Sequence, residues 1–252
     1  MTLKTIKTTF DIINVLIELD GARVTELAER MDRPTSTIHD YLKALNEGGY
    51  VVKEGQTYRV SSRFLYFGQR ARNQRKIFDA ARGQIESLAA ETGEYASLTV
   101  EEQGYGILLY TVQGEKAVDI DTPDGVRTKL HATAMGKCVL ANLSQERVEA
   151  IIEDHGLDER TPHTTTDREA LFAELEEIRE QGYAIDEEEQ FEGMQGVGAP
   201  ITGMSGTVRG AVGVYGPIGR TGNPNAKERI REAVSEAVNV IEVSLKYPSD
   251  YP

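Results

Sequence analysis

The most informative stretch in the N-terminal part of this chain is RPTSTIHDYLKAL, from Arg33 to Leu45. Ile38, Leu42 and Leu45 recur at spacings of four and three, which places them on one buried edge of a helix. Thr35 is the expected N-cap, and the Glu-Gly-Gly run at 47–49 is expected to end the helix. The opposite edge carries short polar side chains near the helix N-terminus, where they suit a phosphate or a base edge. The candidate DNA-binding residues, on this edge and just before it, are Arg33, Thr35, Ser36, Thr37, His39, Asp40 and Lys43.

Two more helices and a hairpin surround this helix. A first helix is predicted by an apolar stripe at helical spacing, formed by Ile6, Phe10, Ile13 and Ile17. A short second helix is expected over 24–31, with inward side chains of Leu27, Ala28 and Met31. Residues 50–60, YVVKEGQTYRV, contain two β-prone runs around a Glu-Gly-Gln turn. Three helices followed by a hairpin predict a winged helix-turn-helix domain, which we assign to residues 4–66.

The charge of the chain is divided unevenly along the sequence. Residues 1–76 carry 13 Lys and Arg against 9 Asp and Glu, whereas residues 77–252 carry 15 against 32, within a net charge of −13. The first segment therefore keeps the basic balance that phosphate contacts require. The alternative is an ordinary helical subdomain whose polar face is merely solvated. The hairpin, the basic balance and the short turn before Thr35 favour DNA binding.

The composition also bears on the environment of the protein. The chain has 18 Arg but only 10 Lys, beside 41 Asp and Glu. An acidic, Lys-poor surface indicates a halophilic protein made for concentrated salt, although an acidic oligomer at ordinary salt explains it as well. Neither a signal-peptide pattern nor a long apolar run is found, so we expect a cytoplasmic protein with no membrane association. A single cysteine, Cys138, excludes an internal disulfide and fits a reducing compartment.

The rest of the chain predicts a larger mixed domain. A linker helix and candidate dimer contact is expected over 67–92, from the helical spacing of Ile77, Ala81, Ile85 and Leu88. Residues 93–252 are expected to form an α+β domain. Its helices are expected at 134–143, 145–155, 167–181 and along the C-terminal stripe from Ile230 to Leu245, and its strands within 95–122, 182–186, 196–201 and 209–215. Thr166 and Glu169 form an expected capping box for the third of these helices.

Several segments resemble the IclR-type transcription regulators. ELAERMDRPTSTIHDYLKALNEGGYV resembles their N-terminal domain, and the most characteristic segments of their effector-binding domain resemble LHATAMGKCVLANL, GYAIDEEEQFEGMQGVGAPI and RGAVGVYGP. The resemblance covers nearly the whole chain in the right order. It implies a GAF-like C-terminal domain and a homodimer or tetramer. It also implies binding to double-stranded, pseudo-palindromic operator DNA, with repression or activation of catabolic genes.

The resemblance further implies an effector site. It places the backbone amides of Ala134 and Met135 against the effector, and exposed N–H groups at a helix start form a natural anion site. It makes Asp186 the acidic pocket residue, which can accept a hydrogen bond from a ligand hydroxyl. Members that bind very small oxo-acids carry Cys and Ser at three further positions, which here hold Gly196, Gly213 and Tyr215. Two glycines and one tyrosine predict room for a larger acid, such as a sugar acid or an aromatic acid.

Asp40 departs from the family pattern, which commonly has Arg at this point of the recognition helix. An aspartate repels phosphate but can accept a hydrogen bond from cytosine N4, so the operator sequence of relatives does not transfer. Lys43 is expected to support a phosphate rather than a base. The expected mechanism is that the effector shifts the placement of two DNA-binding heads through the linker helix.

No catalytic, metal or cofactor site is expected. In the DEEE run at 186–189, successive strand residues alternate faces, so only Asp186 is assigned to a site and the others to a solvated strand end. His131 and Cys138 with a carboxylate could bind zinc, but a single thiol disfavours this, and His131 is expected to pack or hydrogen-bond. The glycines at 193, 196 and 198 miss the nucleotide-binding spacing.

We therefore predict an effector-responsive regulator without enzymatic activity. Two alternatives stay open at this point. One is an enzyme whose C-terminal domain converts a small molecule, with the N-terminal module used only for assembly. The other is an adaptor whose third helix contacts a partner protein.

Overall fold

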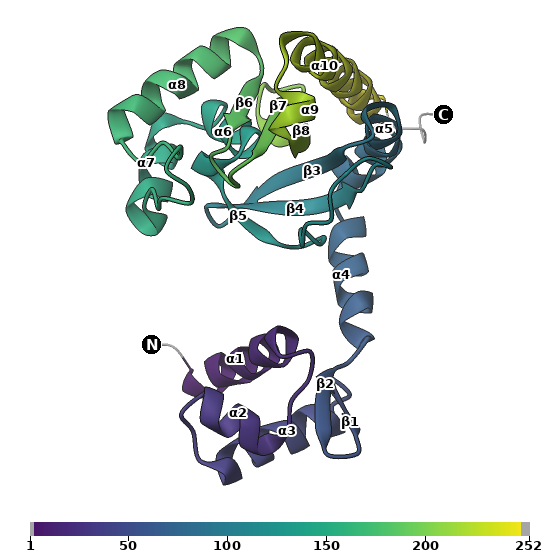
Figure 1. Ribbon diagram of the computed structural model, residues 1–252, viewed down its shortest axis with the longest axis vertical. Helices are drawn as coiled ribbons and strands as arrows, with labels where there is room; N and C mark the ends of the chain where they lie inside the picture. Colours follow the sequence, from purple (N-terminus) through teal and green to yellow (C-terminus); the bar gives the residue numbers. More distant parts are fainter. Residues whose placement is uncertain (1–2, 248–252) are drawn as a thin grey trace. The chain divides into compact units, whose positions relative to one another are not determined.

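The computed structural model describes residues 3–247, which fold into two compact units (Figure 1). The first unit ends at Ala71 and the second begins at Arg72. Residues 248–252 of the expected effector domain lie outside the described residues. Within residues 3–247, no helix is both long and apolar enough to span a membrane.

The first unit is a winged helix-turn-helix. Its elements are α1 (Lys4–Glu18), α2 (Val24–Arg30), α3 (Thr35–Glu47), β1 (Val51–Glu54), β2 (Thr57–Val60) and the greater part of α4 (Arg63–Asn73). The predicted inner edge of α3 is confirmed, because Ile38, Leu42 and Leu45 are buried. β1 and β2 form the predicted antiparallel hairpin. Ala22 pairs with Tyr58, which ties the turn after α1 to this hairpin.

Of the apolar stripe predicted for α1, only Ile13 packs inward. Ile6, Phe10 and Ile17 are 54%, 57% and 62% exposed, whereas Ile12 and Leu16 are buried beside Ile13. The helix has two neighbouring apolar edges, and the packing of α2, α3 and the hairpin buries only one of them. The other edge leaves a row of apolar side chains on the surface of the unit.

Two predicted helix caps are wrong by one residue. Thr35 is the first residue of α3, and the N-cap is Pro34, which makes no side-chain cap. At α8 (Arg168–Gln181), the cap is Asp167 rather than Thr166, since Asp167 Oδ1 accepts from the Ala170 N–H at 2.8 Å. At α8, Thr166 and Asp167 both have side chains that can cap a helix, so the sequence alone does not say which of the two is the N-cap.

The single linker helix expected over 67–92 is two helices. α4 ends at Asn73 and α5 (Lys76–Thr92) begins after Arg75. Ile77, Ala81 and Ile85 are buried against the sheet of the second unit, so α5 is a core helix of that unit. The segment between the two domains is therefore shorter than the sequence predicts.

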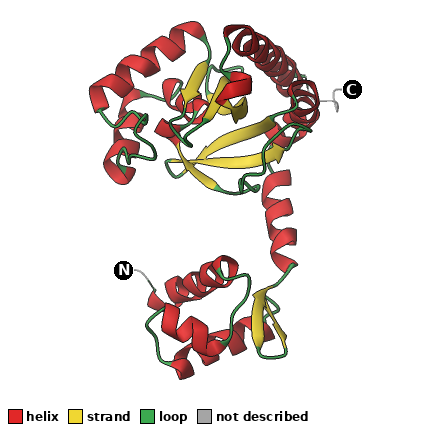
Figure 2. Cartoon of the chain, in the orientation of Figure 1, coloured by secondary structure: helices red, strands yellow, loops and turns green. Residues whose placement is uncertain are grey.

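The second unit contains a six-stranded antiparallel sheet in the order β5-β4-β3-β8-β7-β6 (Figure 2). Its strands are β3 (Tyr95–Glu102), β4 (Tyr105–Val112), β5 (Arg127–Lys129), β6 (Ala184–Glu187), β7 (Met194–Thr202) and β8 (Val208–Pro217). One apolar cluster joins α5 and α10 (Pro224–Lys246) to one face of the sheet. A second cluster joins α6 (Ala134–Ala141), α7 (Gln145–His155) and α8 to the other face. An α+β architecture is therefore confirmed for this unit.

The sequence missed three short elements of this unit. These are β5, the 3-10 turn Leu130–Ala132 and α9 (Ile218–Thr221). Each has three or four residues, which is too short for apolar periodicity to mark it. The 3-10 turn matters for function, because it leads directly into α6.

Candidate DNA-binding helix and effector cavity

The polar edge of α3 is presented to solvent as a continuous surface. Ser36, His39 and Lys43 are exposed and Thr37 is half-buried, on the side of the helix opposite Ile38. The only ion pair among them joins two exposed neighbours, since His39 Nδ1 lies 3.7 Å from Asp40 Oδ1. These short side chains are not engaged in the core and remain available to a ligand.

The turn before α3 is well ordered by backbone contacts. Asp32 has a left-handed φ of 50°, and the Arg33 N–H donates to Ala28 O at 3.0 Å. Arg33 and Thr35 are exposed beside this turn. The candidate residues of the first unit thus gather at the α2–α3 turn and the first three turns of α3. This is the part of a helix-turn-helix that enters the major groove.

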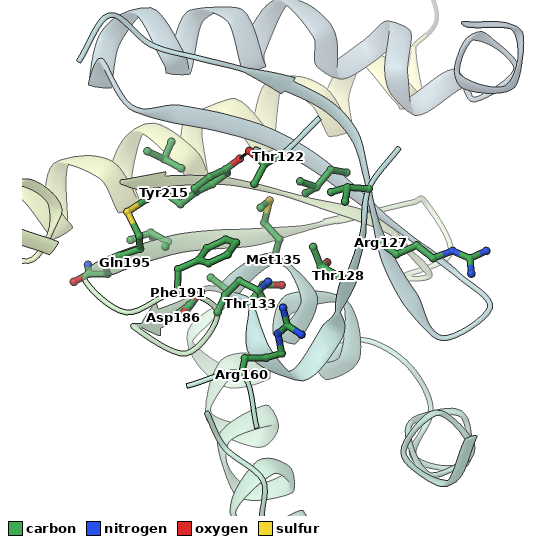
Figure 3. A pocket seen from close by; sticks show the side chains of 18 of the residues that line it. Thr122, Arg127, Thr128, Thr133, Met135, Arg160, Asp186, Phe191, Gln195 and Tyr215 are labelled. Carbon is green, nitrogen blue, oxygen red and sulfur yellow. Dashed lines mark hydrogen bonds between the residues drawn. The ribbon is translucent and has the colours of Figure 1, made fainter. Parts of the chain in front are cut away.

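The second unit encloses a cavity of about 300 Å³ on the α6 side of the sheet (Figure 3). The start of α6, strands β6 to β8 and the loops before β5, before α8 and after β6 form its walls. Its lining residues include Leu108, Thr122, Val126, Thr128, Thr133, Ala134, Met135, Arg160, Asp186, Gln190, Phe191, Gln195, Gly196, Val197, Val214 and Tyr215. The sequence missed the loop residues of this wall, because loops carry no periodic signal.

Strand register brings three of the predicted effector residues into one row. Asp186 on β6 pairs with Gly196 on β7, and Gly196 pairs with Tyr215 on β8. A Cβ placed on Gly196 would lie 3.6–3.7 Å from the Cβ atoms of Ala134, Asp186 and Tyr215, all of which line the cavity. Gly196 therefore leaves a small open space between them.

The start of α6 offers backbone donors to this cavity. Thr133 is the N-cap, and its Oγ1 accepts from the Gly136 N–H at 3.0 Å. The N–H groups of the first helical residues, Ala134 and Met135, have no acceptor inside the helix. Both residues line the cavity, and the N-terminus of a helix is an environment that favours an anion.

Gly213 does not have the position expected from the sequence. It is not among the residues that line the cavity, and a Cβ there would lie 2.7 Å from Met135 Cγ and 2.7 Å from Val197 O. The Met135 side chain thus occupies the space that a side chain at position 213 would need. The expectation that both glycines enlarge the cavity is corrected to Gly196 alone.

Tyr215 is held firmly at one end of the cavity. Its ring stacks on Tyr95 with a centroid distance of 5.2 Å and an interplanar angle of 7°. Its hydroxyl lies 3.1 Å from Thr122 Oγ1 and 3.5 Å from Ser97 Oγ. Burial raises the pKa of the Tyr215 hydroxyl, so it stays protonated and can donate a hydrogen bond.

Asp186 is an unusual carboxyl group. Burial first, and repulsion by Glu189 as well, raise its pKa to about 7, although Lys137 acts in the opposite direction. Its Oδ1 accepts from the Glu189 N–H at 2.8 Å. Near neutral pH the protonated form can donate and the ionised form can accept, so both are useful for binding a hydroxyl or carboxylate.

We expect Asp186 to make the stability of the second unit depend on pH. An unfolded aspartate has a pKa of about 3.9, so the folded state holds its proton to higher pH. Stability is therefore greatest below that value and decreases as pH rises to about 7, by up to about 1.4 kcal/mol per pH unit. Asp186→Asn keeps an acceptor for Glu189 and should lose this dependence. Urea unfolding at pH 5 and pH 8 checks it, and a pH-independent difference from wild type would contradict it.

The DEEE run is only partly solvated, which corrects the sequence interpretation. Glu189 is buried, and its Oε1 and Oε2 lie 2.5 Å and 2.6 Å from Lys137 Nζ. Lys137 itself is fully buried on α6 and also reaches Glu174 Oε1 on α8 at 2.5 Å. The chain turns after β6, so Glu189 escapes the strand alternation and points to α6.

His131 and Cys138 do not form a metal site. The His131 ring Nε2 lies 3.0 Å from Asp158 O, and the Cys138 thiol donates to Gly198 O at 3.2 Å. Burial lowers the pKa of His131 and raises that of Cys138. Within residues 3–247, no group of three or more His, Cys, Asp or Glu side chains is placed to hold a metal ion.

Comparisons with known proteins agree over most of the chain. Family models match the IclR helix-turn-helix domain over residues 5–55 and the bacterial transcriptional regulator IclR C-terminal domain over 69–243. The chain is 36% identical to the probable HTH-type transcriptional regulator ArcR of Halobacterium salinarum, over 94% of this chain and 91% of that protein.

Solved structures share the fold. The crystal structure of Thermotoga maritima IclR has a TM-score of 0.82 and 27% identity, covering 98% of this chain and 100% of that one. An IclR homologue from Microbacterium hydrocarbonoxydans, solved with 4-hydroxybenzoate, has a TM-score of 0.79 and 22% identity, over 94% of this chain and 99% of that one. With a matching family model on each unit, the chain belongs to the IclR family and is a DNA-binding transcriptional regulator, not an enzyme.

Proposed function

We propose that this regulator controls catabolic genes by binding double-stranded operator DNA through α3 and by changing its operator affinity when a small organic acid fills the cavity. The observation that carries the proposal is the pairing of two features in one chain. One is an exposed polar helix start on a winged helix-turn-helix. The other is a cavity of about 300 Å³ with a helix N-terminus in its wall.

The DNA-binding role falls to the first unit. The proposed contacts are Arg33, Thr35, Ser36, Thr37, His39, Asp40 and Lys43, all exposed or half-buried on or just before α3. We assign base-edge contacts to Ser36, Thr37 and His39, which have short polar or ring side chains, and a phosphate contact to Lys43. Asp40 favours operators with a cytosine at the facing position, because its carboxylate can accept a hydrogen bond from the cytosine N4 amino group.

The effector role falls to the second unit. The proposed contacts are the amides of Ala134 and Met135 for a carboxylate, Asp186 for a hydroxyl, and Gly196 and Tyr215 for the body of the ligand. The volume suits an acid larger than a two- or three-carbon oxo-acid, such as a sugar acid or an aromatic acid. The 4-hydroxybenzoate found in the Microbacterium homologue is in keeping with this size.

The protein acts as a homodimer or a pair of dimers. The support for this is the exposed apolar row of Ile6, Phe10 and Ile17 on α1, which a second copy would cover. Multi-angle light scattering of the wild type and of Phe10→Asp tests this assembly, and a monomeric wild type rejects it.

The acidic surface suits operator binding in concentrated salt. Residues 77–252 hold the excess of acidic groups, whereas residues 1–76, which include α3, carry more Lys and Arg than Asp and Glu. In strong salt, counterion release contributes little, and base contacts supply more of the specificity. A halophilic origin is supported by the Halobacterium relative and by the low Lys content.

Selection of genomic fragments by the purified full chain tests the proposed function. We expect enrichment of a small set of fragments with an inverted repeat, in dilute buffer and in molar KCl. Binding to no fragment in preference to random competitor, under both conditions, would reject it. Genes beside the enriched fragments indicate the pathway of the effector.

A further inference from the structure

We infer that Arg160, in the loop between α7 and α8, is the residue that selects a carboxylate effector with a largely apolar body. This inference rests on the proposed effector site and adds a cation that neither the sequence pattern nor the family comparison assigns. Arg160 lies among the residues that line the cavity.

The guanidinium of Arg160 is aimed at the cavity and unpaired. Figure 3 shows it directed toward the other labelled side chains of the cavity, on the side of Thr133. Among the hydrogen bonds and ion pairs of residues 3–247, only the backbone N–H of Arg160 takes part, donating to Thr164 Oγ1 at 3.0 Å. The charge of Arg160 helps to lower the pKa of nearby Asp158, but the ion pair of Asp158 is with Lys129 Nζ at 2.6 Å, so no carboxylate of residues 3–247 lies within ion-pair distance of the Arg160 guanidinium. Such an arginine fork is a strong site for a planar carboxylate.

The loop that carries Arg160 is fixed in place by buried hydroxyl groups. Thr161 Oγ1 donates to Glu188 O at 2.6 Å, and Thr164 Oγ1 donates to Glu189 O at 2.7 Å. Both threonines are buried. The loop is thus attached to the segment after β6 that brings Phe191 to the cavity. The backbone at Arg160 therefore loses little freedom when a ligand binds, although the Arg160 side chain itself is exposed.

The charges around the cavity favour an anion at this end. Thr133, toward which Arg160 points in Figure 3, is the N-cap of α6, and the first amides of that helix have no acceptor inside the helix. The acidic residues that line the cavity are Asp186, which is buried and hydrogen-bonded, and the exposed Asp121. A ligand carboxylate would therefore have two kinds of donor, a guanidinium and helix-start amides.

The middle of the cavity suits an apolar ligand body. Its walls there are made by apolar side chains, which include Leu108, Val126, Met135, Phe191, Val197 and Val214. Gln190 Oε1 is buried and lacks a donor among the described residues, so a ligand hydroxyl or N–H group would satisfy it. A hydroxylated aromatic carboxylate combines a carboxylate for Arg160, an apolar ring for the apolar walls and a hydroxyl donor for Gln190 Oε1.

Arg127 provides a matched control. It also belongs to the cavity lining, but in Figure 3 its side chain points away from the other labelled groups. Its guanidinium lies over the Tyr105 ring, 5.2 Å from the centroid. Arg127→Gln removes the same charge from the same unit without removing a group aimed at the cavity.

The experiment uses the full chain with benzoate, phenylacetate and 4-hydroxybenzoate as probes, and with the neutral amide of each. Isothermal titration is expected to show binding of at least one carboxylate and at least tenfold weaker binding of its amide. Arg160→Gln should weaken the carboxylate at least tenfold and leave the amide unchanged. Arg127→Gln should bind both as wild type does.

Two results would overturn the inference. One is an Arg160→Gln variant that binds the carboxylate as tightly as wild type does. The other is a wild type that binds none of the three carboxylates. Operator selection with the same preparation separates these results from failure of the proposed function, because enriched genomic fragments would leave DNA binding standing while the Arg160 assignment falls.

Discussion

Replacing Lys137 with methionine is expected to lower the free energy of unfolding of the second unit by about 3–5 kcal/mol. The Lys137 ammonium is completely buried and pairs with Glu189 and Glu174. Methionine has a similar length but leaves the Glu189 carboxylate buried without a counter-charge. The loss arises mainly from that uncompensated charge. Urea unfolding at pH 7 measures it as a lower midpoint.

Two companion variants identify the cause. Glu174→Gln should cost much less, because 30% of the Glu174 side chain is exposed and water can replace its partner. Lys137→Met combined with Glu189→Gln should recover most of the loss, since no buried charge is left unpaired. Equal destabilisation of the single and the double variant would show that lost packing, and not the ion pair, is responsible.

The same ion pair organises the effector cavity. Lys137 lies on α6, whose first residues line the cavity, and Glu189 precedes Gln190 and Phe191 in the opposite wall. The pair therefore ties two walls together across 52 positions of sequence. A variant that loosens it should weaken effector binding as well as the fold.

Substituting Ser36, Thr37 and His39 together with alanine is expected to weaken binding to a selected operator by about 100-fold or more. Each good base contact supplies about 1–3 kcal/mol of discrimination, and these side chains are the ones that α3 presents near its start. Fluorescence anisotropy with labelled operator and with a scrambled duplex measures the loss. Binding to the scrambled duplex should change little, because it depends on phosphate contacts.

The control is a double substitution at the other end of the same helix. Asn46→Ala with Glu47→Ala also changes exposed residues of α3, but at its last turn. It should retain operator binding, and circular dichroism should be the same for both variants, because Ile38 and Leu42 still form the core edge. Unchanged operator affinity in the triple variant would argue that α3 does not read the bases.

Local patterns in the sequence were enough to predict α3. The spacing of Ile38, Leu42 and Leu45 and the Glu-Gly-Gly run after them predict an amphipathic helix. Because this helix has a single apolar edge, the sequence also predicts which edge is buried. The stripe of α1 shows the limit of such patterns. Ile6 and Phe10 have helical spacing too, yet packing with the rest of the unit buries the adjacent edge instead.

Strand register brings together three of the residues that the family motif assigned to the proposed effector site. Asp186, Gly196 and Tyr215 form one row across β6, β7 and β8, as the family resemblance implied for a shared pocket. Gly213 was placed in the same pocket and is not there, because the Met135 side chain from α6 occupies its open face. Which of the two glycines borders the cavity depends on where α6 packs against the sheet, and the sequence does not show this.

Residue order and short-range periodicity were enough to predict the two-domain organisation, the amphipathic helix α3 and the uneven charge, and the family resemblance came from equally local motifs. The pairing of Lys137 with Glu189, the packing of Met135 against Gly213 and the place of Arg160 in the cavity wall became visible only in three dimensions. The physical reason is that burial and charge pairing depend on contacts between residues far apart in the chain, and no local spacing encodes those contacts.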